Sequence, residues 1–194
     1  MDLQPAILEN RFVRLEPMAE RHRDALRAAC EADPDVWPAL YPFSWAFEHF
    51  EPTWAKLAAD IAAGTTIAFA VMVDGRCGGI SCFSSIEAAN GSVEIGGTYY
   101  RPELRGGATN PAAKRLMLSH AFEAGARRVQ FKVDAINARS RAAVLKLGAV
   151  QEGVLRQDRV CWTGRVRDTV IFSILSEEWP EVRERLDARL ASFA

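Results

Sequence analysis

The sequence has few of the features that mark secreted, membrane-spanning or metal-stabilised proteins. Its cysteines form no C-x-x-C pair, and their spacing suits neither a zinc site nor a disulfide framework, so we expect free buried thiols in a reducing compartment. They are Cys30, Cys77, Cys82 and Cys161. The first five residues show neither the basic start nor the apolar run of a signal peptide. No apolar run is long enough to span a bilayer, so we predict no membrane span. Together with the cysteine pattern and the missing signal peptide, this favours a cytoplasmic protein without a metal.

A strong charge of either sign is also absent. The 24 lysine and arginine residues face 25 aspartate and glutamate residues, which leaves a net charge of −1 and no overall field for nucleic acid or an anionic membrane. Any phosphate must therefore be bound by a local site. With 194 residues, 49% of them hydrophobic, the chain can form a packed core, and we predict one domain over residues 1–194.

The first third of the chain alternates between regular patterns and an irregular interruption. Residues 11–16 alternate as a strand does, and apolar residues at helical spacing predict helices over 19–32 and from 54 to about 64. Between these helices, residues 33–47 contain three prolines and a dense set of aromatic side chains. These are Trp37, Tyr41, Phe43, Trp45 and Phe47.

The middle of the chain predicts an antiparallel meander. The apolar run 66–73 is typical of a buried strand, and Asp74-Gly75 is a hairpin turn signal. A partner strand through residue 85 and a third strand over 93–100 follow. We therefore expect three neighbouring strands in this part of the sheet.

The second half predicts a mixed α/β arrangement. A helix begins at Pro111, behind Asn110 as its N-cap, and leads to a strand over 127–134. This strand–helix–strand crossover implies a parallel pair. The remaining predicted elements are a helix over 137–147, strands over 150–160 and 168–175 around Thr163-Gly164, and a closing helix from Trp179.

A glycine-rich loop, Arg105-Gly106-Gly107-Ala108, joins the third strand of the meander to the next helix. Glycines let the backbone approach a ligand, and a helix N-terminus suits a phosphate because its N–H groups are unpaired and its dipole end is positive. The G-K-[ST] ending of a nucleoside triphosphate loop and the dinucleotide motif G-x-G-x-x-G are both missing. The alternative interpretation is a plain turn between strand and helix.

Further motifs occur in order around this loop. They are Glu94-Ile-Gly before it, then Phe131-Lys-Val-Asp-Ala-Ile-Asn137-Ala-Arg-Ser140-Arg, Leu147-Gly-Ala, Glu152-Gly153 and Gly164-Arg-Val-Arg-Asp168 after it. In this order and at this spacing they resemble the GNAT superfamily of N-acetyltransferases, and specifically its RimJ/RimL-type branch. The resemblance covers nearly the whole chain, is strongest over 92–175 and is weak over 17–65.

The resemblance implies a GNAT-like acyl-CoA N-acyltransferase fold, in which two strands splay apart and acetyl-CoA lies in the notch. The strand 95–100 would run along the pantetheine arm, and the loop 105–110 would hold the pyrophosphate. The family loop commonly has glycine where this chain has Ala108, and alanine tolerates positive φ poorly, so we expect altered loop geometry there. The cofactor-binding residues implied are Thr98, Tyr99, Tyr100, Arg105, Gly106, Gly107, Ala108, Thr109, Asn110, Asn137 and Ser140.

Asn137 has two interpretations. In the family the equivalent asparagine often hydrogen-bonds the cofactor. From the residues alone it is equally the N-cap of its own helix. Both roles are compatible with each other.

Acyl transfer to an amine needs a base for the ammonium proton and an acid for the leaving thiolate. Many GNAT enzymes use a tyrosine as the acid, but Val144 occupies that position here, and the RimL-type resemblance points to Ser140 instead. The alternative for Ser140 is a capping role or a plain hydroxyl on the helix. Glu94 is the first candidate base, with a hydrogen-bonded structural carboxylate as its alternative, and Asp158 is a lesser candidate. The histidines, expected to serve packing, are His22, His49 and His120.

The aromatic segment is the candidate acceptor side, because in this family the early helices wall the acceptor end of the notch. Trp37, Tyr41 and Trp45 are the predicted substrate-binding residues. Densely spaced aromatic side chains with a few polar tips can form a rigid apolar wall. The alternative is a hydrophobic cluster that anchors a long loop.

The sequence thus predicts an N-acyltransferase that moves an acetyl group from acetyl-CoA to a primary amine by direct attack in a ternary complex. The acceptor is a small-molecule amine or a protein N-terminus. Alternatives are a longer donor such as succinyl-CoA, and a CoA-binding regulator without catalysis. Because the last hairpin leaves an exposed sheet edge and relatives of this type often dimerise, a homodimer is also expected.

Overall fold

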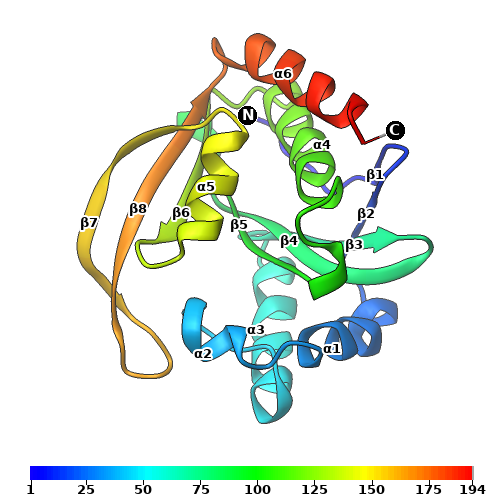
Figure 1. Ribbon diagram of the computed structural model, residues 1–194, viewed down its shortest axis with the longest axis vertical. Helices are drawn as coiled ribbons and strands as arrows, with labels where there is room; N and C mark the ends of the chain where they lie inside the picture. Colours follow the sequence, from blue (N-terminus) through cyan, green and yellow to red (C-terminus); the bar gives the residue numbers. More distant parts are fainter. Residues whose placement is uncertain (194) are drawn as a thin grey trace.

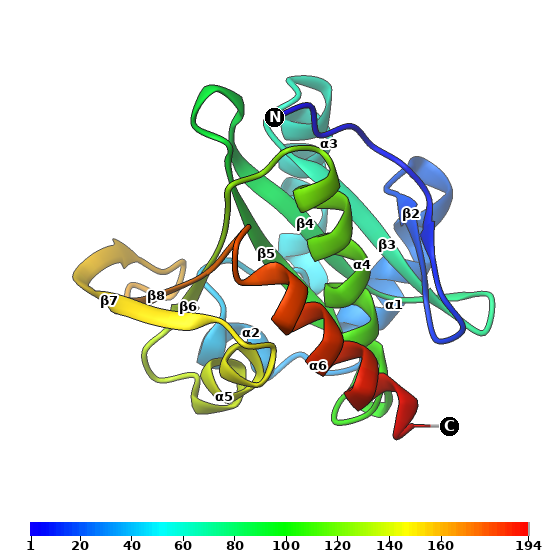
Figure 2. The same ribbon diagram turned by 90° about the horizontal axis from the view of Figure 1, so that it is seen from above.

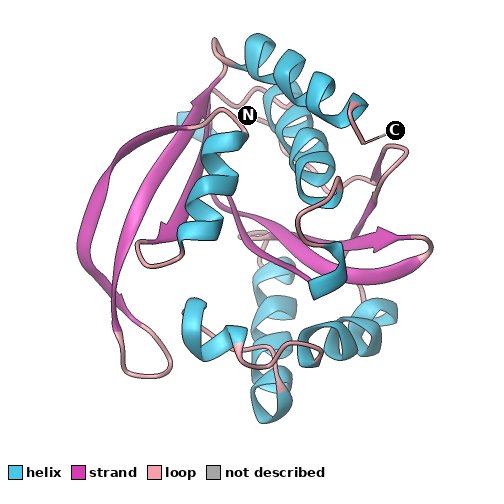
Figure 3. Ribbon diagram, in the orientation of Figure 1, coloured by secondary structure: helices cyan, strands magenta, loops and turns pink. Residues whose placement is uncertain are grey.

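In the computed structural model, which describes residues 1–193, eight strands form one mixed sheet with helices on both faces (Figure 1, Figure 3). The strands of this part of the chain are β1 (Leu8–Glu9), β2 (Arg14–Pro17), β3 (Ile67–Val73), β4 (Arg76–Glu87), β5 (Ser92–Tyr100), β6 (Arg128–Asp134), β7 (Val150–Val160) and β8 (Val166–Leu175). Its α-helices are α1 (Arg23–Glu31), α2 (Val36–Leu40), α3 (Phe50–Ala62), α4 (Thr109–Glu123), α5 (Ala138–Lys146) and α6 (Trp179–Ala191).

The sheet separates two helical layers. Its strand order is β1-β2-β3-β4-β5-β6-β8-β7, and all neighbours are antiparallel except β5 and β6. Helices α1, α2 and α3 lie on one face, and α4, α5 and α6 lie on the other (Figure 1, Figure 2). One buried cluster joins the sheet to α4 and α6, and a second joins it to the first three helices. None of the helices in residues 1–193 is long and apolar enough to cross a membrane.

The meander and the crossover predicted from the sequence are confirmed. The β3 run is buried from Ile67 to Val71, and the β3–β4 turn has positive φ at Asp74 (49°) and Gly75 (73°), as a two-residue hairpin turn requires. Helix α4 connects β5 to β6, and these two strands are parallel. The chain therefore has the mixed α/β fold expected for the GNAT resemblance. The four cysteines are free and buried.

The structure also differs from the sequence predictions in several places. The first strand pair is β1 with β2, and β2 begins at Arg14 instead of residue 11. The proline-rich segment contains a short helix, α2, because Pro38 falls in its first turn, where no backbone N–H is needed. Helix α4 begins at Thr109 with Ala108 as N-cap, so Asn110 is the second helical residue and does not cap the helix.

The parallel pair of β5 and β6 is short. Its register covers three residue pairs and ends at Glu94 opposite Gln130. Just beyond this point β5 carries one more residue than β4 between paired positions, since Ile80 pairs with Tyr99 and Cys82 with Gly96. Such a bulge bends its strand, and Gly97 in it has φ of 57°. Strand β5 therefore leaves β6 after Glu94 and continues along β4 alone.

Candidate active site

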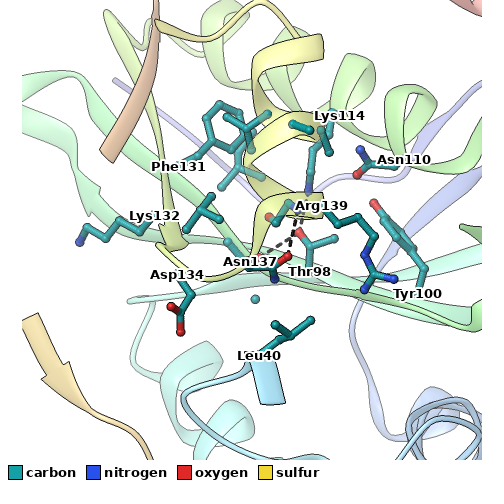
Figure 4. Close-up of a pocket in the computed structure, with 18 of the residues that line it drawn as sticks. Leu40, Thr98, Tyr100, Asn110, Lys114, Phe131, Lys132, Asp134, Asn137 and Arg139 are labelled. Atoms are coloured by element: carbon teal, nitrogen blue, oxygen red, sulfur yellow. Dashed lines mark hydrogen bonds between the residues drawn. The ribbon is translucent and has the colours of Figure 1, made fainter. Parts of the chain in front are cut away.

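The diverging parts of β5 and β6 border a cavity of about 490 Å³ (Figure 4). One side is formed by residues 40–43, at and just after the end of α2, and the other by the first turns of α4 and by α5. The predicted site residues that line it are Tyr41, Glu94, Thr98, Tyr100, Arg105, Gly106, Gly107, Asn110, Asn137 and Ser140. Most of the site predicted from the sequence is thus brought together by the fold.

Five predicted residues do not line the cavity. Trp37 and Trp45 are buried in the core with α1 and α3: the Trp37 indole N–H donates to the Cys30 carbonyl at 3.0 Å, and Trp45 packs edge-on against Phe50. Tyr99 points away because side chains alternate along a strand, and its hydroxyl donates to the Ala29 carbonyl at 2.8 Å. The other two are Ala108 and Thr109, and Thr109 is buried. The expectation that both tryptophans form the acceptor wall is corrected accordingly.

The loop before α4 exposes its backbone. Gly106 has φ of 81°, and a Cβ added at Gly106 or Gly107 would meet no atom within 4 Å. Ala108 is in the right-handed helical region, with φ of −71°. The expected difficulty with alanine is therefore absent, because glycine occupies the left-handed position. No side chain caps α4, so its first N–H groups remain available to an anionic ligand.

Arg105 fixes the loop to the rest of the protein. Its Nη1 pairs with Asp33 at 2.5 Å, and its Nε donates to the Tyr100 carbonyl at 2.8 Å. Within residues 1–193, its buried Nη2 and the buried Tyr100 hydroxyl have no hydrogen-bond partner. A buried polar group without a partner costs about 1–3 kcal/mol. A ligand with oxygen acceptors would relieve this cost at both groups.

Three further positive side chains line the cavity. They are Arg139 and Lys146 of α5 and Arg189 of α6. None of the three forms an ion pair with a carboxylate of the described chain. Acetyl-CoA carries a pyrophosphate and a further phosphate. The exposed loop backbone, the uncapped helix and these cations fit such a group.

Helix α5 positions two of the predicted residues. The Asn137 side chain accepts a hydrogen bond from the Ser140 backbone N–H at 2.9 Å, which confirms it as the N-cap. The cap holds the first turn of α5 against the cavity, where Ser140 is half-buried. Val144 lines the cavity one turn later, at the position where many GNAT enzymes carry tyrosine.

Glu94 lies where β5 and β6 separate. It is the last residue of β5 in register with β6, its side chain is 14% exposed, and it lines the cavity. Lys132 of β6 pairs with it at 3.1 Å. Asp134, two residues further along β6, also lines the cavity and pairs with Arg165 at 2.5 Å. Both carboxylates are therefore held in place by neighbouring cations.

Tyr41 contacts β5 from the opposite side. Its hydroxyl donates to the Thr98 carbonyl at 2.8 Å, beyond the point where β5 loses its β6 partner. Burial raises the pKa of Tyr41 to about 12. The hydroxyl is therefore a neutral hydrogen-bond donor at physiological pH.

The sequence analysis missed Lys114, a buried amine on the cavity wall (Figure 4). Lys114 shares a face of α4 with Met117, Leu118 and Ala121, all buried. This i, i+3, i+4, i+7 spacing was the available signal, because it places a lysine on an apolar helix face. Burial lowers the pKa of Lys114 to about 7.

The histidines lie outside the cavity. His22 is buried and contacts Glu16 at 3.1 Å, as expected for packing. His49 stacks edge-on against Trp162, and the His120 ring contacts the Gln4 carbonyl at 2.7 Å. Asp158 is also outside the cavity and accepts a hydrogen bond from Thr169.

Comparison with known proteins agrees with this geometry. A family model described as an acetyltransferase (GNAT) domain matches residues 13–150. A GCN5-related N-acetyltransferase from Brucella melitensis is 32% identical with a TM-score of 0.89, over 98% of this chain and 87% of that one. A candidate acetyltransferase from T. thermophilus is 38% identical with a TM-score of 0.87, over 98% and 100% of the two chains.

A third similar structure is RimJ from Mycobacterium smegmatis in complex with CoA-disulfide. It is 26% identical with a TM-score of 0.83, over 95% of each chain. Functionally curated proteins gave no significant match. The sheet opens after Glu94, an uncapped helix follows a glycine loop, and the family match and the 38% identical structure cover most of the chain. The protein therefore belongs to the GNAT acetyltransferase family and is an acyl-CoA-dependent N-acetyltransferase.

Proposed function

We propose that the protein transfers an acetyl group from acetyl-CoA to a primary amine by direct attack in a ternary complex. The observation that carries the proposal is the cavity at the divergence of β5 and β6. It has an end suited to phosphates, a carboxylate where the strands separate, and a hydroxyl on the facing helix. These are the groups that acyl transfer to an amine requires.

The phosphate end would bind the CoA moiety. The pyrophosphate oxygens would accept hydrogen bonds from the backbone N–H groups of Gly106, Gly107 and the start of α4. Its charge would be balanced by Arg139, Lys146 and Arg189. Bound acetyl-CoA supplies the activated acyl group as a thioester. Tyr100 and Arg105 each offer a donor that lacks a partner within residues 1–193.

The transfer itself would use Glu94 and Ser140. Glu94 lies at the apex of the notch, where its carboxylate attracts the acceptor ammonium and accepts a proton from it. Ser140 would donate to the departing thiolate, since Val144 has no acidic group. Neither cysteine nor histidine lines the cavity in the described chain, which favours direct attack over an acyl-enzyme with either residue.

The acceptor would enter beside residues 40–43. Tyr41 and Phe43 line this side, and their rings would contact the aliphatic part of the acceptor. This wall suits a slender amine, either on a small molecule or at an exposed protein N-terminus. The four buried thiols are compatible with the cytoplasm.

Thiol release from acetyl-CoA with a panel of amines tests the proposal. We expect turnover with at least one primary amine and slower turnover with succinyl-CoA as donor. Calorimetry of CoA binding should accompany the assay. Tight CoA binding without turnover on any amine would instead favour a CoA-binding regulator, and faster turnover with succinyl-CoA would favour the longer donor.

The proposed homodimer would use β7, which forms the sheet edge. Its apolar side chains are unusually exposed, with Val150 at 53%, Val154 at 48% and Val160 at 68%. An exposed apolar edge strand invites pairing with another strand. A dimer mass in light scattering at micromolar concentration is expected, and a monomer mass would contradict it.

A further inference from the structure

Three polar side chains form a closed cluster beside the cavity, and two of them, Lys114 and Thr98, are seen in Figure 4. The Lys114 Nζ lies 2.8 Å from the Ser81 Oγ and 2.7 Å from the Thr98 Oγ1. The two hydroxyls are themselves 2.8 Å apart. Lys114 comes from α4, Ser81 from β4 and Thr98 from β5. Of the three residues, Lys114 and Thr98 line the cavity.

The cluster contains no counterion for the amine. Lys114 is 5% exposed and forms no ion pair with any carboxylate of residues 1–193. The charged form of a buried lysine without a partner is strongly disfavoured. Two hydroxyls can, by contrast, hydrogen-bond a neutral amine, donating to its lone pair or accepting from its N–H groups. The geometry therefore suits a lysine that loses and regains its proton.

The surroundings of Lys114 favour the same behaviour. The titratable group that acts on it from β4 is Cys82, whose own pKa is raised to about 12 by burial, so the thiol stays neutral at physiological pH. The titratable β5 residues that line the cavity are Glu94, which is paired with Lys132 at 3.1 Å, and Tyr100, whose pKa burial also raises. The charged residues of α5 nearest the cavity are Arg139 and Lys146, both cationic. None of these groups would hold a permanent charge on the Lys114 amine.

We propose that Lys114 receives, through the Thr98 hydroxyl, the proton released by the acceptor amine. The inference rests on the proposed acetyl transfer and assigns to Lys114 the proton that would otherwise go to Glu94. Glu94 is paired with Lys132 at 3.1 Å, so its carboxylate already has a cationic partner in the described chain. In this scheme Glu94 attracts the ammonium by charge, and Lys114 holds its proton. A base is most effective when its pKa lies near the working pH.

The proton and bond changes balance. The acceptor ammonium gives one proton to Lys114, relayed by the Thr98 hydroxyl, and becomes a neutral amine. The amine nitrogen then forms a bond to the thioester carbon, and the bond from that carbon to sulfur breaks. The thiolate takes the second proton of the attacking nitrogen, by way of Ser140. Lys114 releases its proton to solvent after the products leave.

Lys114→Met tests this role, because it removes the amine and keeps an unbranched side chain. We expect kcat to fall by about 10²-fold, while CoA affinity by calorimetry stays within about threefold of wild type. The wild-type kcat should also fall as pH is lowered through about 7, and this ionisation should disappear in the variant. Thr98→Val, which removes only the relay hydroxyl, should show the same pattern. Lys56→Met is the matched control, because the Lys56 side chain of α3 is exposed to solvent.

A second readout does not need catalysis. Since burial lowers the pKa of Lys114 in the folded protein, the unfolded chain binds more protons between about pH 7 and 10.5, and the free energy of unfolding should rise with pH across this window. That rise should be smaller in Lys114→Met than in wild type or Lys56→Met. Carbon-13 NMR of labelled lysines should show one lysine that titrates near neutral pH.

The outcomes separate the two proposals. An unchanged kcat and pH profile in Lys114→Met, with active wild-type enzyme, would overturn the role of Lys114 and leave acetyl transfer intact. If wild type turns over no amine, the proposed function itself fails, while the NMR titration still reports on Lys114. If Lys114→Met does not fold, Thr98→Val and the wild-type titration decide. A titration in which every lysine, Lys114 included, stays charged above pH 9 overturns the inference.

Discussion

The two ends of the cavity are built in different ways. The end proposed for the phosphates consists mainly of one continuous segment, which comprises the end of β5, its loop and the start of α4 and exposes backbone N–H groups. The acceptor end gathers side chains from residues 40–43, β6 and β8, which are far apart in the sequence. A site made from backbone depends on local conformation, whereas a site made from distant side chains depends on packing.

This contrast explains which predictions succeeded. The glycine loop and the helix behind it were predicted from the sequence, although the helix begins two residues earlier than predicted, because glycine and helix termini act locally. In the aromatic segment the sequence could not separate wall from scaffold. Tyr41 lines the cavity, whereas Trp37 and Trp45 support it from the core, and all three have the same local signature.

The largest expected effect tests this division between wall and scaffold. Trp45→Ala removes a side chain that is 4% exposed and packed against Phe50, so the free energy of unfolding should fall by about 3–5 kcal/mol. Chemical denaturation measures it. Acceptor KM at low temperature should stay normal. A stable variant with a raised acceptor KM would show instead that Trp45 contributes to acceptor binding.

Ser140→Ala tests the middle of the cavity. Ser140 is half-buried, and the N-cap bond uses its backbone N–H, which alanine keeps. Stability should therefore change little. If the hydroxyl donates in the transition state, kcat should fall by about 10²-fold while the KM for acetyl-CoA changes less. Steady-state kinetics measure both constants. An unchanged kcat in the variant would indicate that water, and not Ser140, protonates the leaving thiolate.

Gly107→Glu tests the phosphate end. The position has open space for a side chain, so the fold should persist, but a carboxylate would face the pyrophosphate. CoA affinity by calorimetry should drop at least tenfold, or about 1.4 kcal/mol. Gly153→Glu is the matched control, because Gly153 on β7 is equally open and does not line the cavity. Equal CoA affinities in the two variants would show that the pyrophosphate does not bind at the loop before α4.

The smallest expected effect concerns Tyr41. Tyr41→Phe removes the hydroxyl that donates to the Thr98 carbonyl and retains the ring. One hydrogen bond contributes about 0.5–1.5 kcal/mol, so acceptor KM should rise by less than about tenfold. CoA affinity should remain unchanged if the two ends are independent. A larger loss of CoA affinity than of acceptor affinity would show that Tyr41 serves the phosphate end through β5.

The sequence by itself determined most of the regular elements of this protein and the glycine loop before α4. Hydrophobic periodicity, the Asp74-Gly75 turn and the glycines before α4 act over a few residues, so their consequences can be predicted without the fold. Only the tertiary structure decided where β5 leaves β6, which aromatic side chain reaches the cavity, and that Lys114 is enclosed by Ser81 and Thr98. Those outcomes depend on how separate elements pack, and packing also sets the burial that lowers the pKa of the lysine.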